Sequence, residues 1–349
     1  MSSVSIGNLT RQEIYQQPDT WPETLARVRA ANIGQLPAPV LTGAGTSAYA
    51  AEAIEPGWPG ARAVPSTELF LDFGRYLCGE GLVVSLARSG DSPESLAVVS
   101  RIQRAFPRVR HIALTANPDG KLANWPGVET VLLDPRTNDR SLVMTSSFTN
   151  LVLAGLALAR PGEVAEAAPV LCAAVREALP RLDEEAARWA ERAPVRFAAL
   201  ASAALRAAAR EACLKVLEMT AGRVVTLAET YLGLRHGPMS FLTEDTLVLC
   251  FVSSDPRLRR YELDLARELR AKRLGRLIAL GPAPASDFDG VLETPASLLP
   301  DWLRTPAEIV FAQLLGWHLS RRCGLDPDNP SPARIISRVV QGVRIYEED

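Results

Sequence analysis

Two short turns that combine glycine with hydroxyl side chains are the strongest candidates for chemistry in this sequence. The first, Gly43-Ala44-Gly45-Thr46-Ser47, follows the apolar run 40–42 and precedes a segment of helical composition. Glycine lets backbone N–H groups approach an anion without a Cβ in the way, and the positive end of the following helix points to the same place. We therefore expect Gly45, Thr46 and Ser47 to bind a phosphate group.

The same turn allows two other interpretations. Gly43-x-Gly45-x-x-Ala48 also fits a dinucleotide-binding fingerprint, which requires an acidic residue about 20 residues further along the chain. Glu68 is the only loose candidate for that acid. A tight turn that binds no ligand is the remaining alternative.

The second turn is Arg88-Ser89-Gly90-Asp91-Ser92-Pro93-Glu94-Ser95, between an apolar run and a helix-forming segment. Open α/β sheets bind ligands at the carboxyl ends of their strands, so this position favours a binding site. Ser92 could instead serve only as the N-cap of the helix. Because an arginine and two serines stand beside another anion-binding turn, we expect Arg88, Ser89 and Ser92 to contribute to the phosphate site.

A third hydroxyl-rich segment is Met144-Thr145-Ser146-Ser147-Phe148-Thr149, at the predicted start of another helix. Its four hydroxyl groups exceed what one N-cap needs. Ser146 is therefore a candidate for lining a sugar pocket. Simple capping together with threonines on the helix surface is an equally good explanation.

Lys215 and Glu218 could act on a substrate, Glu218 in acid–base chemistry and Lys215 in binding the sugar phosphate. Their i,i+3 spacing places them on one face of a predicted helix, and their neighbours are apolar on nearly every side. Partial burial makes a carboxylate a better general base, so Glu218 is the candidate base. From the spacing alone, a weak ion pair on the helix surface is the simpler interpretation.

His236 is the candidate proton carrier because it lies between Arg235 and the Gly237-Pro238 dipeptide, which predicts a rigid turn. The other two histidines, His111 and His318, fall in a predicted strand and in an apolar helix. We expect both of them to be structural.

The elements that must position these residues form an alternating pattern. Apolar runs predict strands at 40–42, 82–86, 111–114, 128–133, 197–200, 224–227, 247–252 and 277–280. Helical patterns cover 10–33, 47–54, 92–105, 145–158 and 202–220, and 163–192 indicates one or two long helices without a strand signal. Strands that alternate with helices predict an α/β fold of two tandem doubly wound parallel sheets, each an αβα sandwich of the flavodoxin-like or Rossmann-like kind.

The pattern repeats within the chain. Residues 81–89 align with 246–254, and 41–45 align more loosely with 199–203, where the glycines are missing. Only the first copy therefore keeps a loop suited to an anion. The predicted division is an N-terminal helical segment (1–33), a first, phosphate-binding domain (34–160), a helical linker (161–194), a second domain (195–335) and a C-terminal tail (336–349).

Composition narrows the class of protein. A chain of 349 residues with a net charge of −2 is large enough for two domains and has no basic excess for a nucleic acid. The five scattered cysteines and three histidines lack zinc-ligand spacing and are typical of a reduced cytoplasmic protein. No signal-peptide pattern is visible, and the longest apolar run, 151–159, is too short for a bilayer and predicts a buried helix.

Taken together, five segments resemble the sugar isomerase (SIS) family. They are 43–47, 87–95, 138–149, 232–238 and 338–343, and they extend over nearly the whole chain. The Arg-Ser-Gly-x-Ser-Pro-Glu-Ser and Asn-Asp-Arg-Ser runs resemble the AgaS-type galactosamine-6-phosphate deaminase/isomerase branch, once described as tagatose-6-phosphate ketose/aldose isomerase.

The resemblance implies roles for individual residues. In the related isomerase domain of glucosamine-6-phosphate synthase, hydroxyls matching Thr46, Ser47, Ser89 and Ser92 hold the sugar phosphate. Glu218 matches the carboxylate that moves a proton between sugar carbons, and His236 matches the histidine that assists ring opening, often from the neighbouring subunit. Arg338 stands where the synthase has a lysine, and Ala87 and Arg88 stand where it has serine and glutamine. Arginine cannot form a Schiff base, so Arg338 would act through its charge.

The implied activity is conversion of a 2-amino-2-deoxyhexose 6-phosphate into a ketose 6-phosphate and ammonia, with galactosamine 6-phosphate as the expected substrate. No metal or redox cofactor is expected, and the expected partner beyond the sugar phosphate is a second copy of the chain, in a homodimer without nucleic acid or membrane. Alternatives are a tagatose-type aldose–ketose isomerase and a glucosamine-6-phosphate deaminase. A sugar-phosphate sensor without catalysis and a nicotinamide enzyme are more remote.

Overall fold

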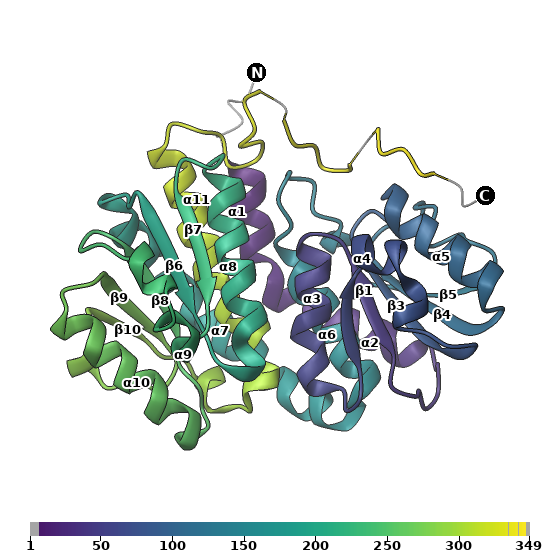
Figure 1. Ribbon diagram of the computed structural model, residues 1–349, viewed down its shortest axis with the longest axis horizontal. Helices are drawn as coiled ribbons and strands as arrows, with labels where there is room; N and C mark the ends of the chain where they lie inside the picture. Colours follow the sequence, from purple (N-terminus) through teal and green to yellow (C-terminus); the bar gives the residue numbers. More distant parts are fainter. Residues whose placement is uncertain (1–6, 334, 341, 347–349) are drawn as a thin grey trace. The chain divides into compact units, whose positions relative to one another are not determined.

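The computed structural model describes residues 7–333, 335–340 and 342–346. The chain forms two compact units. We call residues 19–168 with 334–349 the first-sheet unit, and residues 1–18 with 169–333 the second-sheet unit. Each unit contains one five-stranded sheet with helices on both faces (Figure 1).

The sheet of the first-sheet unit is parallel throughout. Its strands are β1 (Val40–Gly43), β2 (Arg62–Pro65), β3 (Glu80–Ala87), β4 (Arg108–Thr115) and β5 (Val128–Leu132), in the order β2-β1-β3-β4-β5. Its helices are α2 (Gln17–Ala30), α3 (Thr46–Ile54), α4 (Ser66–Leu71), α5 (Pro93–Ala105) and α6 (Ser146–Ala159). This is the doubly wound order in which the direction of winding reverses between β1 and β3.

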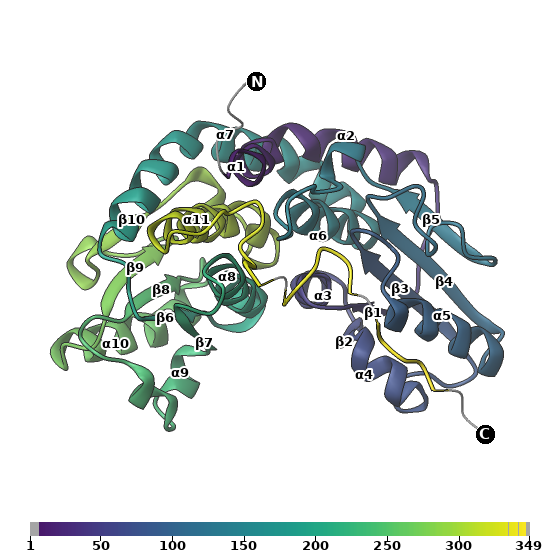
Figure 2. The same cartoon turned by 90° about the horizontal axis from the view of Figure 1, so that it is seen from above.

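Helices cover both faces of this sheet because its strands are apolar on both sides. Leu69 of α4 and Ile102 of α5 pack on Val83 and its neighbours, and α4 and α5 lie side by side in Figure 2. On the other face α3 packs against α6. A Cβ on Gly155 of α6 would lie 2.3 Å from Cδ1 of Ile54, so glycine permits this close helix contact.

The second-sheet unit has the same strand order when its strands are counted along the chain. They are β6 (Arg196–Leu200), β7 (Val225–Glu229), β8 (Leu247–Phe251), β9 (Arg276–Leu280) and β10 (Gly290–Leu292), in the parallel order β10-β9-β8-β6-β7. The helices are α1 (Asn8–Tyr15), α8 (Arg206–Met219), α9 (Tyr231–Leu234), α10 (Pro256–Ala271) and α11 (Asp301–Arg322), and α7 (Pro161–Glu191) begins in the first-sheet unit.

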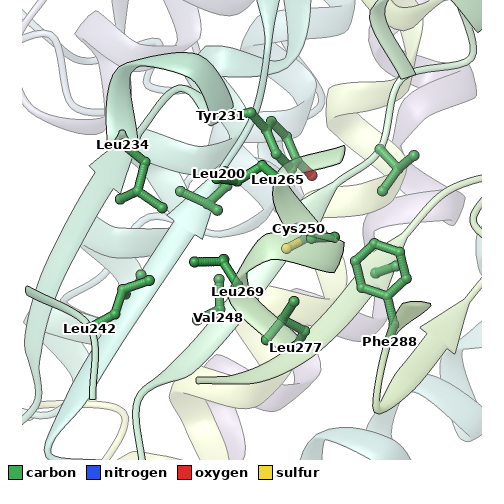
Figure 3. Packing of buried hydrophobic residues seen from close by; sticks show 14 residues of the cluster. Leu200, Tyr231, Leu234, Leu242, Val248, Cys250, Leu265, Leu269, Leu277 and Phe288 are labelled. Carbon is green, nitrogen blue, oxygen red and sulfur yellow. The ribbon is translucent and has the colours of Figure 1, made fainter. Parts of the chain in front are cut away.

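The period-two alternation of β8 builds the core on one face of this sheet. Val248 and Cys250 point toward Leu265 and Leu269 of α10, beside Tyr231 of α9 (Figure 3). Leu249, which lies between them, points to the opposite face, where α8 packs on the sheet and α11 packs on α8. Among the described residues, no helix combines the length and the apolar character needed to cross a bilayer.

The eight predicted strands are confirmed, with ends that differ by at most three residues. The single helix predicted over 10–33 is wrong, since α1 and α2 are separate and Gln16 lies between them. The helix predicted over 202–220 starts later, because 203–205 form a 3-10 turn in which Ala203 has a φ of 46°. The segment 163–192 is one helix, α7, and the run 151–159 lies in the buried α6.

Two edge strands were not predicted. In β2 only Val64 of the four residues is fully buried, and β10 has three residues, so neither shows the apolar run of a central strand. Residues 1–6 of the predicted helical segment, 334 of the second domain, and 341 and 347–349 of the predicted tail lie outside the described residues.

Candidate functional site

The first turn, 43–47, connects β1 directly to α3. A Cβ on Gly43 would lie 2.7 Å from the backbone carbon of Ser47, so only glycine lets the helix start this close to the strand. Gly45 has φ 56° and ψ −128°, a conformation that side chains strongly disfavour. Both predicted glycine requirements therefore have a physical basis in the turn itself.

Thr46 and Ser47 are the first two residues of α3 and are buried. The Ser47 amide donates to the Ala44 carbonyl at 3.1 Å, and the Ser47 hydroxyl lies 4.0 Å from the sulfur of Met144. The turn thus places two hydroxyl groups at the positive end of α3, an arrangement that can hold an anion.

The second turn, 88–92, is held from one side by the loop that follows β4. Asn117 Nδ2 donates to the Ser89 carbonyl at 2.8 Å, and the Leu122 amide donates to the Gly90 carbonyl at 2.9 Å. A Cβ on Gly120 would lie 2.2 Å from the Ser89 carbonyl oxygen. Asn117 and Gly120 were missed in the sequence because they act through backbone contacts that no spacing rule reveals.

The two turns lie at the same edge of the sheet. β1 and β3 are hydrogen-bonded neighbours with Thr42 opposite Ser85, and each turn follows the carboxyl end of its strand. The winding reverses between these two strands, which is where doubly wound sheets bind ligands. Ser47 and Ser89 are therefore brought to one switch point, as the sequence predicts.

Ser89 and Ser92 keep hydroxyls near this edge. Ser92 occupies the N-cap position of α5, but its side chain makes no capping hydrogen bond. The Ser89 hydroxyl accepts a 3.3 Å hydrogen bond from the Asp91 amide and retains its own proton to donate. The purely capping interpretation of Ser92 thus has no hydrogen bond to support it.

The Arg88 guanidinium points to backbone carbonyls. It is buried and donates to the carbonyls of Leu142 at 3.0 Å, Ser141 at 3.3 Å and Arg338 at 2.6 Å. These hydrogen bonds therefore connect the second turn to two other segments of the first-sheet unit, 141–142 and the C-terminal segment.

Arg338 lies in the C-terminal segment of the first-sheet unit and is held by the run 138–139. Its Nε donates to the Asp139 carbonyl at 2.7 Å, and its Nη2 donates to Oδ1 of Asn138. Gln341, which belongs to the predicted 338–343 motif, lies outside the described residues.

Ser146 is fully buried at the start of α6, and its hydroxyl donates to Oδ1 of Asp139. The proton of this hydroxyl is therefore used within the protein, and only its acceptor lone pairs could meet a sugar. Asp139 also accepts hydrogen bonds from the amides of Thr145 and Ser147, so Asp139 caps α6. Neither the sugar-binding nor the simple capping interpretation of this segment included Asp139. No periodic spacing links an irregular loop to the helix after it, so the sequence carried no signal for this role.

In the second-sheet unit, α8 brings Lys215 and Glu218 together. Lys215 Nζ lies 2.6 Å from Glu218 Oε2 and 3.4 Å from Glu211 Oε1. Lys215 and Glu211 have no exposed side-chain surface, whereas the Glu218 side chain is 25% exposed. Burial alone would lower the pKa of Lys215, but the two carboxylates more than offset it and the pKa is raised, so the lysine stays charged.

The predicted turn at His236 is present. His236 follows α9, its amide donates to the Gly233 carbonyl at 2.9 Å, and Gly237 has a φ of 116°. Arg235 fastens the turn to α10 through Glu268 at 2.7 Å and Asp264 at 2.8 Å. The His236 side chain is exposed, and within the part of the chain that the structure describes it forms no hydrogen bond with Glu218.

The other two histidines have internal partners. His111 Nε2 lies 3.2 Å from the Ser85 hydroxyl, and burial lowers the pKa of His111 to about 4. His318 Nε2 lies 2.7 Å from Asp183, which also binds Arg11 and Tyr15. Both positions fit the structural roles predicted for them.

The second sheet has an edge equivalent to the one that carries the two turns of the first sheet, and a carboxylate occupies it. Ser253 and Ser254 follow β8, the counterpart of β3, and both hydroxyls donate to Asp301 at the start of α11. The Ser254 amide donates to the same carboxylate at 2.8 Å, and Arg304 pairs with it at 2.7 Å. An internal anion thus takes the position that an external one would need. Across the described ranges, no three His, Cys, Asp or Glu side chains gather to hold a metal ion.

Known proteins place this geometry in context. No protein-family model matches the chain. A relative from Streptomyces coelicolor is 37% identical and covers 97% of this chain and 95% of its own. The protein named D-galactosamine-6-phosphate deaminase AgaS from Escherichia coli O157:H7 is 34% identical and covers 99% of this chain and 97% of its own.

A solved structure is also similar to this chain over nearly its whole length. It is described as a tagatose-6-phosphate ketose/aldose isomerase from Escherichia coli, matches with a TM-score of 0.88 at 31% identity, and covers 98% of this chain and 97% of its own. Two tandem doubly wound sheets, a hydroxyl-rich switch point and similarity along nearly the whole chain lead to one assignment: the chain belongs to the AgaS-type branch of the SIS family of phosphosugar enzymes.

Proposed function

We propose that the chain is a deaminase that converts D-galactosamine 6-phosphate into a ketose 6-phosphate and ammonia. The observation that carries the proposal is the similarity, at 34% identity over 99% of the chain, to a relative named for this substrate. The arrangement of the two turns at one switch point supports a phosphate-bearing substrate.

The phosphate is held by the first-sheet unit. The hydroxyls of Thr46, Ser47, Ser89 and Ser92 donate to its oxygens, and the backbone at Gly45 lets the anion approach the start of α3. These contacts are remote from the reacting carbons, so their binding energy can be used to orient the sugar.

His236 assists opening of the sugar ring, which exposes the aldehyde at carbon 1. Glu218 then removes the proton from carbon 2 and returns a proton to carbon 1 through an enaminol. The product of this transfer is a ketimine at carbon 2. Water adds to the C=N bond and ammonia leaves, which gives the ketone. Lys215 holds the Glu218 carboxylate in a fixed orientation through their 2.6 Å contact.

Several features of the whole chain belong to the same proposal. The domains are 34–160 and 195–335, they arose as an internal repeat, and the identical strand order of the two sheets supports this. The enzyme acts as a homodimer, and the exposed His236 side chain is suited to serving a partner's site. It works in the cytoplasm, in agreement with five cysteines that form no disulfide.

A second candidate is a plain aldose–ketose isomerase acting on tagatose 6-phosphate. The description of the matching solved structure favours it. The same proton transfer between carbons 2 and 1 would serve, since only the substituent at carbon 2 differs.

One assay separates the candidates. The purified protein is incubated with D-galactosamine 6-phosphate and with D-glucosamine 6-phosphate, and ammonia release is measured for each. The proposal expects ammonia from the galacto sugar at a higher kcat/KM. Ammonia from the gluco sugar alone would assign the other deaminase. Absence of ammonia from both, together with interconversion of tagatose 6-phosphate and its aldose, would establish the isomerase instead.

A further inference from the structure

Asp139 is a fully buried residue that has no role in the proposed reaction. Its Oδ2 accepts from the Thr145 amide at 2.8 Å, the Ser147 amide at 2.9 Å and the Ser147 hydroxyl at 2.6 Å, and its Oδ1 accepts from Ser146. A buried carboxylate is costly unless such donors replace its water. Four donors at the start of α6 meet that need, and the helix dipole adds to it.

The backbone of the same residue holds a second segment. The Asp139 carbonyl accepts from Arg338 Nε at 2.7 Å, while the neighbouring Asn138 side chain accepts from the same guanidinium. The run 138–139 therefore connects α6 on one side to the C-terminal segment on the other.

Arg338 carries the connection to the phosphate turn. Its carbonyl accepts from Arg88 Nη2 at 2.6 Å, and Arg88 also donates to the carbonyls of Ser141 and Leu142. Arg88 directly precedes Ser89 and is 6% exposed, so a change in its position moves the turn. Three sets of hydrogen bonds, joined by the covalent bonds of Arg338 and Asp139, thus connect Arg88 of the 88–92 turn to α6.

We propose that Asp139 is a positioning residue of the phosphate site, which it sets through Arg338 and Arg88. Arg88, Arg338 and Ser146 then act by holding the 88–92 turn in place, and they do not contact the sugar. This inference rests on the proposed function in one respect, namely that the 88–92 turn binds the phosphate. It adds a residue with no predicted role and gives a common purpose to three residues that the sequence had placed at the sugar.

The test uses Asp139→Asn and Arg338→Ala in the full chain. Asparagine keeps the shape of Asp139, but it replaces one carboxylate oxygen, an acceptor, by an NH₂ group, which is a donor and faces other donors. Both variants should raise the Kd for inorganic phosphate and the KM for D-galactosamine 6-phosphate by about tenfold, with a smaller change in kcat. The double variant should bind phosphate no more weakly than the weaker-binding single variant, because both substitutions act on the same turn.

The matched control is Asp255→Asn. Asp255 also caps a helix, α10, and accepts from the Arg257 amide at 2.7 Å, but it lies in the second-sheet unit. This control should leave phosphate affinity and KM unchanged.

Three outcomes decide the matter. Unchanged phosphate affinity in a folded Asp139→Asn, with only a lower unfolding temperature, would make Asp139 a helix cap and overturn the inference. If Asp139→Asn does not fold, Arg338→Ala decides alone, since it removes no cap from α6, and unchanged affinity there overturns the inference equally. If the wild-type protein binds phosphate and the sugar phosphate but releases no ammonia, the proposed function fails while the positioning role can still be measured through Kd.

Discussion

Lys215 donates a 2.6 Å hydrogen bond to Glu218, and it does so from a position without solvent exposure. The ammonium is shared with Glu211, 3.4 Å away. One ammonium group lies between two carboxyl groups, and only Glu218 of the three residues reaches the surface of its unit. The arrangement holds one carboxylate at a defined place where a substrate could meet it.

Glu218→Gln should abolish ammonia release while leaving the KM for the sugar phosphate nearly unchanged. Glutamine keeps the size of the side chain and an acceptor for Lys215, but it cannot take a proton. Glu166→Gln, at an exposed position of α7, is the control and should behave as wild type. A Glu218→Gln enzyme that retains more than a tenth of the wild-type kcat would exclude Glu218 as the base.

Lys215→Met should destabilise the protein by about 3 kcal/mol, since removal of one partner leaves a buried charge uncompensated. Its buried partner is Glu211, and the double variant Glu211→Gln, Lys215→Met should recover most of the loss. Thermal unfolding of the two variants measures the difference. If the double variant is no more stable than Lys215→Met alone, the loss of stability does not come from the unpaired buried carboxylate of Glu211.

Ser89→Ala should raise KM about tenfold or more and change kcat less, because the lost hydrogen bond is to a charged group far from the reacting carbons. Steady-state kinetics with D-galactosamine 6-phosphate gives both constants. Ser286→Ala, at an exposed position in the second-sheet unit, supplies the control. A tenfold fall in kcat with an unchanged KM would argue against a binding role for Ser89.

The central strands could be predicted from the sequence because their residues are buried on both faces, which produces unbroken apolar runs such as 82–86. The edge strand β2 could not, since Arg62, Ala63 and Pro65 remain partly or fully exposed. The break between α1 and α2 could not be predicted either, because the sequence on both sides of Gln16 favours a helix. The prolines gave no guide, since Pro22 lies inside α2 and does not end it.

For the site, residue types indicated where the two turns lie, since each turn follows the carboxyl end of a buried strand at one edge of the sheet. They could not predict which polar groups were already occupied. Ser146 and Arg88 resemble ligand donors in the sequence, yet Asp139 and three backbone carbonyls take up their hydrogen bonds. Such partners come from irregular loops, whose course is set by tertiary contacts.

Gly45→Ala should weaken phosphate binding, because a Cβ disfavours φ 56° with ψ −128° by roughly 1–3 kcal/mol. The turn would relax and the start of α3 would move away from the anion. Gly34→Ala is a matched control, since Gly34 also has a positive φ, 78°, but lies exposed before β1 with no atom near its missing Cβ. Equal phosphate Kd values for the two variants, measured by calorimetry, would show that the turn conformation does not matter for binding.

The internal anion of the second sheet gives a prediction for pH. Arg304 pairs with both Asp301 and Glu308, and desolvation, only partly offset by Arg304, raises the pKa of Glu308 to about 7. The ordinary pKa of this carboxyl is 4.5, so between pH 4.5 and 7 the folded protein binds a proton that the unfolded chain has lost. Stability from this group is therefore complete below about pH 4.5 and falls as pH rises to 7, by up to about 3 kcal/mol.

Glu308→Gln abolishes the titration of this side chain, because glutamine is neutral and resembles the protonated carboxyl at every pH. The difference in unfolding temperature between Glu308→Gln and wild type should therefore shift in favour of the variant as pH rises from 4.5 to 7, and stay constant above pH 7. Measuring the difference cancels the titration of all other groups. Glu166→Gln should show no such trend, since Glu166 is exposed. A difference between Glu308→Gln and wild type that does not vary with pH would mean that Glu308 is ionised throughout, with Arg304 fully compensating its burial.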